Sequence, residues 1–421
     1  MAKLIALWAV PALTSVLMGL LTVVLLARYF VLPFRADVLP RLAGPPPAKR
    51  RARKRAPVRD VLISVGAAFL LSRSLILLVA AIATRGEALR SAELWSRWDA
   101  NHYLGLARSW YVNEGDARLH LVFFPLYPLI LRGFVALGID AFAAGVLVSN
   151  ACLFGAGWAL YRLVELDGGA QSAARAVLLM MLTPLSFFFS IPYSESLFLL
   201  LTLVSVLMAR RRRFAPAIAL AALASSARLL GLLAAVPIFY EMLLVVREKK
   251  GGELKRALIC ALRCLPVALG FLAYLYLNFS VSGDPLRFLT YQREHWSQQM
   301  GSLSGTLRYT LSNAIHYRDA TLQWGTWIPQ LLSILASIGM LTATYRKLNA
   351  GDAAYALLYI YLAISPTWLL SGPRYLTAMY PLYPMLTALT EDKRAEASVM
   401  ALSVVATCGM VYQYLVLGGV M

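Results

Sequence analysis

The sequence has few charged residues and, among them, few acids. Only 14% of its 421 residues are charged, 60% are hydrophobic and the mean hydropathy is +0.66. This composition excludes an ordinary soluble domain and is typical of a polytopic membrane protein. Asp and Glu number 21 against 40 Lys and Arg, for a net charge of +19. Because positive loops of membrane proteins stay in the cytoplasm, we interpret this excess first as a topology signal and not as nucleic-acid binding.

Cysteine is also scarce, and the sequence lacks a glycine-rich nucleotide loop and short internal repeats. The four cysteines (Cys152, Cys260, Cys264 and Cys408) lie in apolar runs, without zinc-site spacing to histidine. We interpret them as small packing residues. The sequence therefore predicts no metal and no nucleotide cofactor.

Long apolar runs alternate with basic clusters. The N-terminal run is longer than a signal-peptide core and lacks a clear cleavage site, so we expect a retained helix. Placing every basic cluster in the cytoplasm predicts about twelve transmembrane helices. They lie near residues 5–32, 60–84, 142–163, 174–191, 195–209, 214–228, 229–247, 257–280, 326–344, 352–370, 375–391 and 396–418.

This topology predicts an all-α polytopic membrane protein in three parts. Residues 1–34 form an N-terminal transmembrane helix, and residues 35–59 form a proline-rich, basic cytoplasmic linker, compatible with anionic lipid head groups. Residues 60–421 form the main transmembrane domain, with outer loops at 85–141 and 281–325. The run FFPLYPLILRGFVALG in the first loop is short and contains two prolines and an arginine, so we expect an interfacial helix there.

The first outer loop contains the stretch RWDANHYLGLARSWY, which begins at Arg97. On a helix, Asp99 shares a face with Trp95, His102 and Tyr103. A carboxylate ringed by aromatics at the bilayer surface is a candidate general base, but it is equally an interfacial acid paired with Arg97.

Other polar residues extend this set of candidates. Glu195 lies at a predicted helix start, where a carboxylate also serves as a cap. Arg73 lies inside a predicted span and is therefore either functional or paired with a carboxylate. Arg228 and Arg374 lie at outer helix ends, where either could hold a phosphate.

Five blocks in order resemble the PIG-V family of mannosyltransferases: RWDANHYLGLA with FFPLYPLILR, PLSFFFSIPYSESLFLLL, ARLLGLL and GDPLRFLTYQREHW. The resemblance covers roughly residues 60–380, so residues 1–59 fall outside it. Eukaryotic members add the second mannose of glycosylphosphatidylinositol anchors, and prokaryotic relatives exist. The family belongs to the GT-C class of membrane glycosyltransferases, which use a polyprenyl-phosphate sugar donor and carry the catalytic acid in the first outer loop.

The resemblance thus implies a GT-C-type fold and makes Asp99 the catalytic base of an inverting mannosyl transfer at the extracytoplasmic or lumenal face. The expected partners are polyprenyl- or dolichyl-phosphate-mannose, a lipid or glycan acceptor and membrane lipids, with no nucleic acid and no required metal. Trp95, Trp98 and Tyr103 would anchor the loop in the interface. The substrate-binding candidates are Trp98, His102, Tyr103, Glu195, Arg228, Trp296 and Arg374.

Two other functions fit the sequence less well. One is a GT-C transferase of another lipid-linked sugar. The other is a lipid or sugar transporter, for which ionisable groups near the bilayer midplane are expected. Apart from Arg73, the polar residues of this sequence gather in the outer loops.

Overall fold

The computed structural model describes residues 2–31, 55–248 and 252–420. Within these ranges the chain is all helical, with no β-strand beyond a single bridge between Met300 and Pro366. The predicted all-α class is therefore confirmed. Most of the predicted linker lies outside the described residues.

The elements follow one another along the chain without a separate soluble domain. The first half contains α1 (Ala2–Phe30), α3 (Val58–Ala83), η1 (Glu87–Leu89), α4 (Asp99–Ser109), η2 (Gly115–Val122), α5 (Leu126–Ala136), α6 (Ala141–Leu182), η3 (Ser186–Phe189), α7 (Glu195–Arg210) and α8 (Phe214–Ala227). The second half contains η4 (Leu229–Ala234), α9 (Ala235–Arg247), α10 (Glu253–Cys264), η5 (Leu265–Ala268), α11 (Leu269–Ser282), α12 (Arg287–Trp296), α13 (Leu303–His316), α14 (Ala320–Leu322), η6 (Gln323–Trp327), α15 (Ile328–Thr344), α16 (Ala350–Ile364), α17 (Gly372–Thr377), α18 (Leu382–Leu389), α19 (Lys393–Tyr412) and η7 (Gln413–Leu417).

Seven helical segments of the described chain are long and apolar enough to cross a membrane. Others that we expected to span are shorter: α7 has 16 residues, α8 has 14 and α16 has 15, against about 20 for a perpendicular crossing. The expected span at 375–391 is divided between α17 and α18. The protein is thus a polytopic helical membrane protein, and the number of twelve crossings stays a prediction.

The longest helical segment, α6, contains the expected span at 142–163 and the first half of the one at 174–191, which ends at Leu182 instead. At Gly169 the backbone is not helical, with φ at 82°, a value that favours glycine. A Cβ placed on Gly157 would lie 3.0 Å from the Cε of Met181, although these residues are 24 positions apart. A straight helix would separate them by about 36 Å, so α6 is a hairpin that folds back at Gly169.

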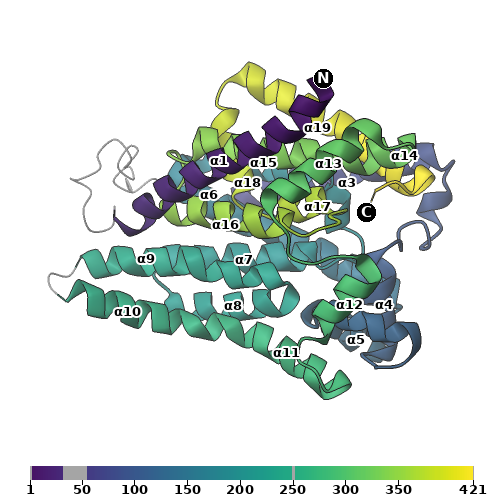
Figure 1. The fold of residues 1–421 in the computed structure, drawn as a ribbon, viewed down its shortest axis with the longest axis horizontal. Coiled ribbons are helices and arrows are strands. Elements are labelled where there is room, and N and C mark those ends of the chain that lie inside the picture. The colour runs from purple at the N-terminus through teal and green to yellow at the C-terminus, as the bar shows by residue number, and fades with distance from the viewer. Residues whose placement is uncertain (1, 32–54, 249–251, 421) are drawn as a thin grey trace.

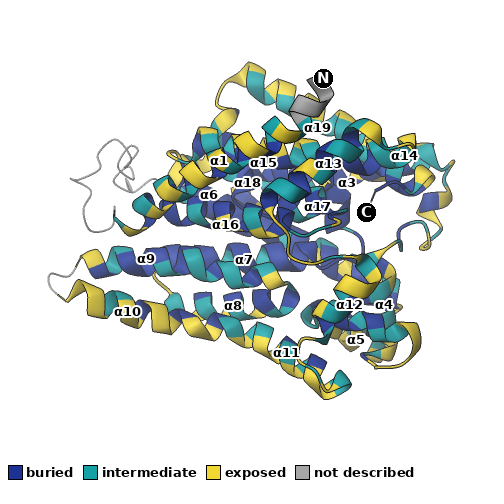
Figure 2. Cartoon of the chain, viewed as in Figure 1, coloured by how far each residue is buried: buried dark blue, intermediate teal, exposed yellow. Residues whose placement is uncertain are grey.

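The helices form two stacked groups (Figure 1). One contains α1, α3, α6, α13 and α15 to α19, and the other contains α7 to α11. The central helix α7 packs against α6, α8 and α9 and is largely buried (Figure 2), whereas α10 and α11 present exposed leucines outward. Helix α1 belongs to the bundle, because it packs on α13 and α16 and the Tyr29 hydroxyl donates to the Val236 carbonyl at 2.6 Å.

The two predicted outer loops lie together at one end of the bundle. There α12 contacts η2, and the Tyr291 hydroxyl donates to Oδ1 of Asn113 at 3.0 Å. Helix α5 has only 11 residues, as expected for an interfacial helix. Arg211 lies beyond the opposite end of α7 from Glu195, about 24 Å away along a helix of this length.

This arrangement predicts opposite accessibility for the two ends of α7. In a variant without the four native cysteines, Asp116→Cys in the first outer loop should react with an impermeant maleimide from outside intact cells. Arg213→Cys should react only after the cells are opened, because its basic cluster is predicted to hold this loop in the cytoplasm. Labelling of both positions from the same side would contradict the topology.

Candidate active site

The site begins at the sharp turn into α4. Trp98 has φ at 53°, an uncommon conformation for a residue with a side chain, and α4 begins at Asp99. The expectation that Trp95 shares a helix face with Asp99 is therefore wrong, because Trp95 lies before the helix. The turn leaves the Asp99 carboxylate at a helix N-terminus, where the helix dipole favours negative charge.

Asp99 is the first of four charged side chains that form a continuous row of ion pairs. Its Oδ2 accepts a hydrogen bond from Nη2 of Arg374 at 2.6 Å. Nε of Arg374 lies 3.3 Å from Oε1 of Glu195, and the same oxygen lies 2.7 Å from Nη1 of Arg228. Acids and arginines thus alternate, and the four residues come from α4, α17, α7 and the junction of α8 with η4.

Aromatic rings surround the two arginines of this ion-pair row. The guanidinium carbon of Arg374 lies 4.9 Å from the ring centre of Tyr193 and 5.3 Å from that of Tyr375. The guanidinium carbon of Arg228 lies 5.1 Å from the ring centre of the same Tyr375. Cation–π attraction therefore adds to the ion pairs and restricts where each guanidinium can lie.

Exposure differs strongly along the row. The side chains of Glu195 and Arg374 are 1% and 3% exposed, whereas those of Arg228 and Asp99 are 15% and 30% exposed. Among the described residues, Oδ1 of Asp99 and the Nε and Nη2 atoms of Arg228 form no hydrogen bond. Asp99 and Arg228, at the two ends of the row, thus have free hydrogen-bonding atoms, whereas Arg374 and Glu195 at its centre are buried.

The structure rules out two roles that the sequence left open, an ion pair of Asp99 with Arg97 and a helix cap at Glu195. The guanidinium of Arg97 donates to the carbonyls of Tyr414 and Leu415, so Arg97 is not the partner of Asp99. Glu195 does begin α7, but its carboxylate faces the arginines and forms no helix cap.

Arg73 has no carboxylate partner among the residues that the structure describes. Its guanidinium donates to the carbonyls of Ser186 and Met181, at 2.9 and 3.2 Å, and to the hydroxyl of Ser190. The expectation of a carboxylate pair for Arg73 is therefore wrong: it ties α3 to the segment around η3, where backbone carbonyls satisfy it.

Tyr103 and Trp95 are buried in protein, so their expected role as interface anchors is wrong. The Tyr103 hydroxyl lies 2.9 Å from Oγ of Ser194, which also accepts from Nη1 of Arg228 at 3.2 Å. Nε1 of Trp95 donates to the Ala88 carbonyl. Of the three expected anchors, only Trp98 is exposed.

His102 and Trp296 meet beside Asp99, where the two outer loops join. The His102 ring stacks on Phe123 at 4.8 Å and meets Trp296 edge-on at 6.2 Å. Burial lowers the pKa of His102, while Asp99 opposes this shift and His295 adds to it. A neutral imidazole and an indole thus lie beside the exposed end of the row. Among the described residues, no group of three or more His, Cys, Asp and Glu is arranged to hold a metal.

Sequence reasoning missed the residues that hold the row in place. Tyr193 donates its hydroxyl to the Arg97 carbonyl at 2.9 Å and supports Arg374, and Ser194 connects Tyr103 with Arg228. The signal was their position directly before Glu195 in SIPYSESLF.

Loss of the central carboxylate should destabilise the fold. In Glu195→Ala, Arg228 loses its ion pair and Arg374 keeps only Asp99, and removing one partner of a buried pair typically costs about 3–5 kcal/mol. We expect a clearly lower melting temperature in detergent, followed by tryptophan fluorescence. The control is Glu248→Ala, which breaks the exposed pair with Arg212 and should cost less than about 1 kcal/mol. Equal melting temperatures for the two variants would contradict a structural role of the row.

The family model described as Mannosyltransferase (PIG-V) matches residues 77–287, just over half of the chain. The match includes Asp99, Glu195 and Arg228, whereas Arg374 lies beyond it. No curated protein and no solved structure matches the chain. The chain belongs to the PIG-V family of mannosyltransferases, and it is a membrane glycosyltransferase.

Proposed function

We propose that this protein transfers mannose from a polyprenyl- or dolichyl-phosphate-mannose donor to a hydroxyl of a lipid or glycan acceptor, with inversion, at the extracytoplasmic face. The observation that carries the proposal is the ion-pair row, which ends in a reachable carboxylate at Asp99 and a reachable guanidinium at Arg228. Family membership supports the sugar and the reaction type.

Asp99 is the general base of this proposal. Three other acids of these loops and helix ends are less suited to this role: Glu195 is buried between two arginines, and Glu114 and Asp116 lie exposed in the first outer loop. Asp99 alone combines a fixed orientation with a free oxygen, since Arg374 holds Oδ2 and leaves Oδ1 for the acceptor proton. Its position beside His102 and Trp296 suits a site that binds the acceptor sugar or head group.

Arg228 is the phosphate-binding residue of this proposal. One of its Nη atoms is used by Glu195 and Ser194, and its other N–H groups remain for a phosphate oxygen. Arg374 is sealed and serves mainly to hold Asp99. A charge-assisted hydrogen bond from Arg228 would stabilise the leaving phosphate as its charge develops.

The chemistry is a single displacement. The acceptor oxygen bonds to the anomeric carbon while the bond from that carbon to the phosphate oxygen breaks. The acceptor proton passes to Oδ1 of Asp99, and the polyprenyl phosphate leaves with the bonding electron pair. Because attack and departure are on opposite faces, a β-linked donor gives an α-linked product.

Asp99→Asn should remove the base with little change in shape. We expect transfer of labelled mannose from polyprenyl-phosphate-mannose to fall by about 10²–10⁴-fold, the usual value of general-base catalysis. The variant should still purify and bind donor. The matched control is Asp116→Asn, which removes a fully exposed carboxylate of the same loop and should retain activity. Near wild-type transfer by Asp99→Asn would show that Asp99 is not the base.

Arg228→Lys should keep the positive charge but lose the planar fork of the guanidinium. We expect the KM for the donor to rise about tenfold or more, since a hydrogen bond to a charged group is worth about 1.5–3 kcal/mol. The KM for the acceptor should be unchanged. The exposed Arg118→Lys serves as the control. A change in the KM for the acceptor alone would show that Arg228 binds the acceptor and not the donor phosphate.

A further inference from the structure

A groove lies between α8, α9 and α10 at the end of the bundle away from the ion-pair row. It consists of two adjoining cavities of about 260 and 560 Å³. The larger falls within the range of about 300–1,000 Å³ that is usual for ligand sites. Both cavities are lined by Phe214, Met242 and Arg263, so they form one continuous groove.

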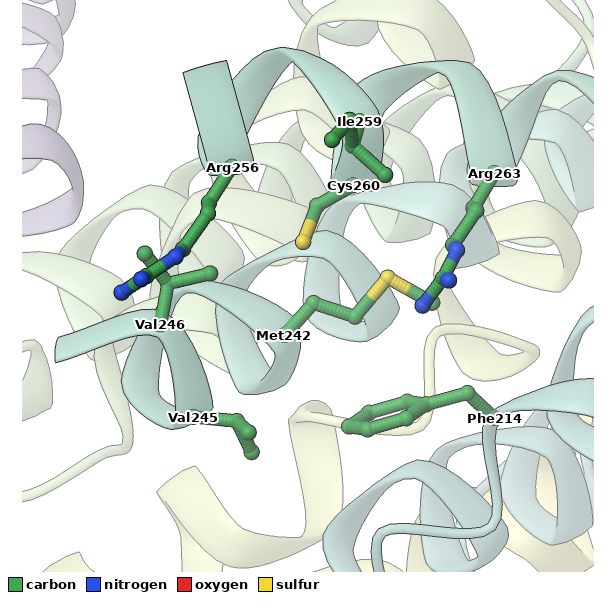
Figure 3. A pocket seen from close by; sticks show the side chains of 8 residues that line it. All are labelled: Phe214, Met242, Val245, Val246, Arg256, Ile259, Cys260 and Arg263. Atoms are coloured by element: carbon green, nitrogen blue, oxygen red, sulfur yellow. The ribbon is translucent and has the colours of Figure 1, made fainter. Parts of the chain in front are cut away.

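The walls of the groove are apolar along most of its length. Figure 3 shows Met242 of α9 and Cys260 of α10 pointing toward each other, and Val245, Val246 and Ile259 also line this part of the groove. Toward the outer end, the lining continues with small side chains of α8 and with two further residues, Pro266 and Leu269. Arg263 is the one charged side chain that lines this part of the groove, and its other walls suit a hydrocarbon chain.

The groove closes before it reaches the active-site end. A Cβ on Gly270 would lie only 1.9 Å from the carbonyl oxygen of Ala222, so the backbones of α8 and α11 touch there. Ser225 seals the contact by donating to the Val267 carbonyl at 2.7 Å. Helix α8 is about 21 Å long and separates the entrance at Phe214 from Arg228. The groove is therefore distinct from the donor-phosphate position proposed above.

Two arginines line the entrance, and no acidic residue does. Arg256 and Arg263 are seven positions apart and share a face of α10 with Ile259 and Cys260 (Figure 3). Among the described residues, no carboxylate pairs with Arg263. Arg263 lies within an apolar segment, Glu253–Ser282, that is long enough to span the bilayer. An arginine at such a position is costly unless an anion or water satisfies it.

We propose that this groove binds one anionic glycerophospholipid of the leaflet predicted to face the cytoplasm. One acyl chain lies along the apolar walls formed by α8 and α9, and the head-group phosphate pairs with Arg263. Charge complementarity at the entrance selects an anionic over a zwitterionic head group. The lipid strengthens the contact between α8 and α10, which is otherwise incomplete along the groove.

Lipid retention by the full-length protein tests this proposal. The protein is reconstituted in nanodiscs with equal amounts of phosphatidylglycerol and phosphatidylcholine of identical chains, plus a trace of polyprenyl phosphate. It is then extracted in detergent, and the retained lipids are counted by native mass spectrometry. Wild type should retain phosphatidylglycerol over phosphatidylcholine. Arg263→Gln should reduce this preference about fivefold, the effect of roughly one arginine near an anionic head group.

Two further variants separate charge from groove occupancy. Lys255→Gln removes an exposed charge of α10 that does not line the groove, and it should leave retention unchanged. Ala219→Phe fills the apolar wall and should reduce retention while the entrance arginines remain. Equal retention of the two phospholipids by wild type, or an unchanged preference in Arg263→Gln, would overturn the proposal. Preferential retention of polyprenyl phosphate would overturn the choice of a phospholipid.

Discussion

The contact between Arg374 and Glu195 is the constraint on which the rest of the site depends. Both side chains are removed from water, and a buried charge is stable only when it is paired. Each has a second partner of opposite sign, Asp99 for Arg374 and Arg228 for Glu195. Together these contacts join segments up to 275 positions apart in sequence and hold the first outer loop against the bundle.

Helix α7 is held in the same way at both ends. At its start Glu195 pairs with arginines, and at its end the buried Arg210 contacts the carboxylates of Asp352, Glu241 and Asp167. Between these ends the side chains are mostly apolar, and the helix packs on α6, α8 and α9. Buried ion pairs thus anchor α7 both at the candidate active site and near the opposite surface of the bundle.

Hydrophobic runs and charge clusters predicted where most of the long apolar helices lie, including the two arms of the hairpin in α6, because apolar composition is a local property of the sequence. They did not predict α12 and α13 in the second outer loop, nor the division of residues 375–391 between α17 and α18. All four members of the ion-pair row were named from the sequence. The pairing itself was not predictable, since the contact of Asp99 with Arg374 arises only when α4 meets α17. Periodicity likewise misplaced Trp95, because the positive φ of Trp98 breaks the helix, and it gave no sign that backbone carbonyls satisfy Arg73.

The order of charges along the row matches what the proposed reaction needs. A displacement at the anomeric carbon requires a proton acceptor on the side of attack and a positive charge on the side of departure. The two reachable ends of the row are a carboxylate and a guanidinium, and the sealed pair between them is neutral as a whole. Because the ends are linked through shared partners, neither can move without weakening a buried ion pair. The row thus sets both the polarity of the site and the distance over which the sugar would be transferred.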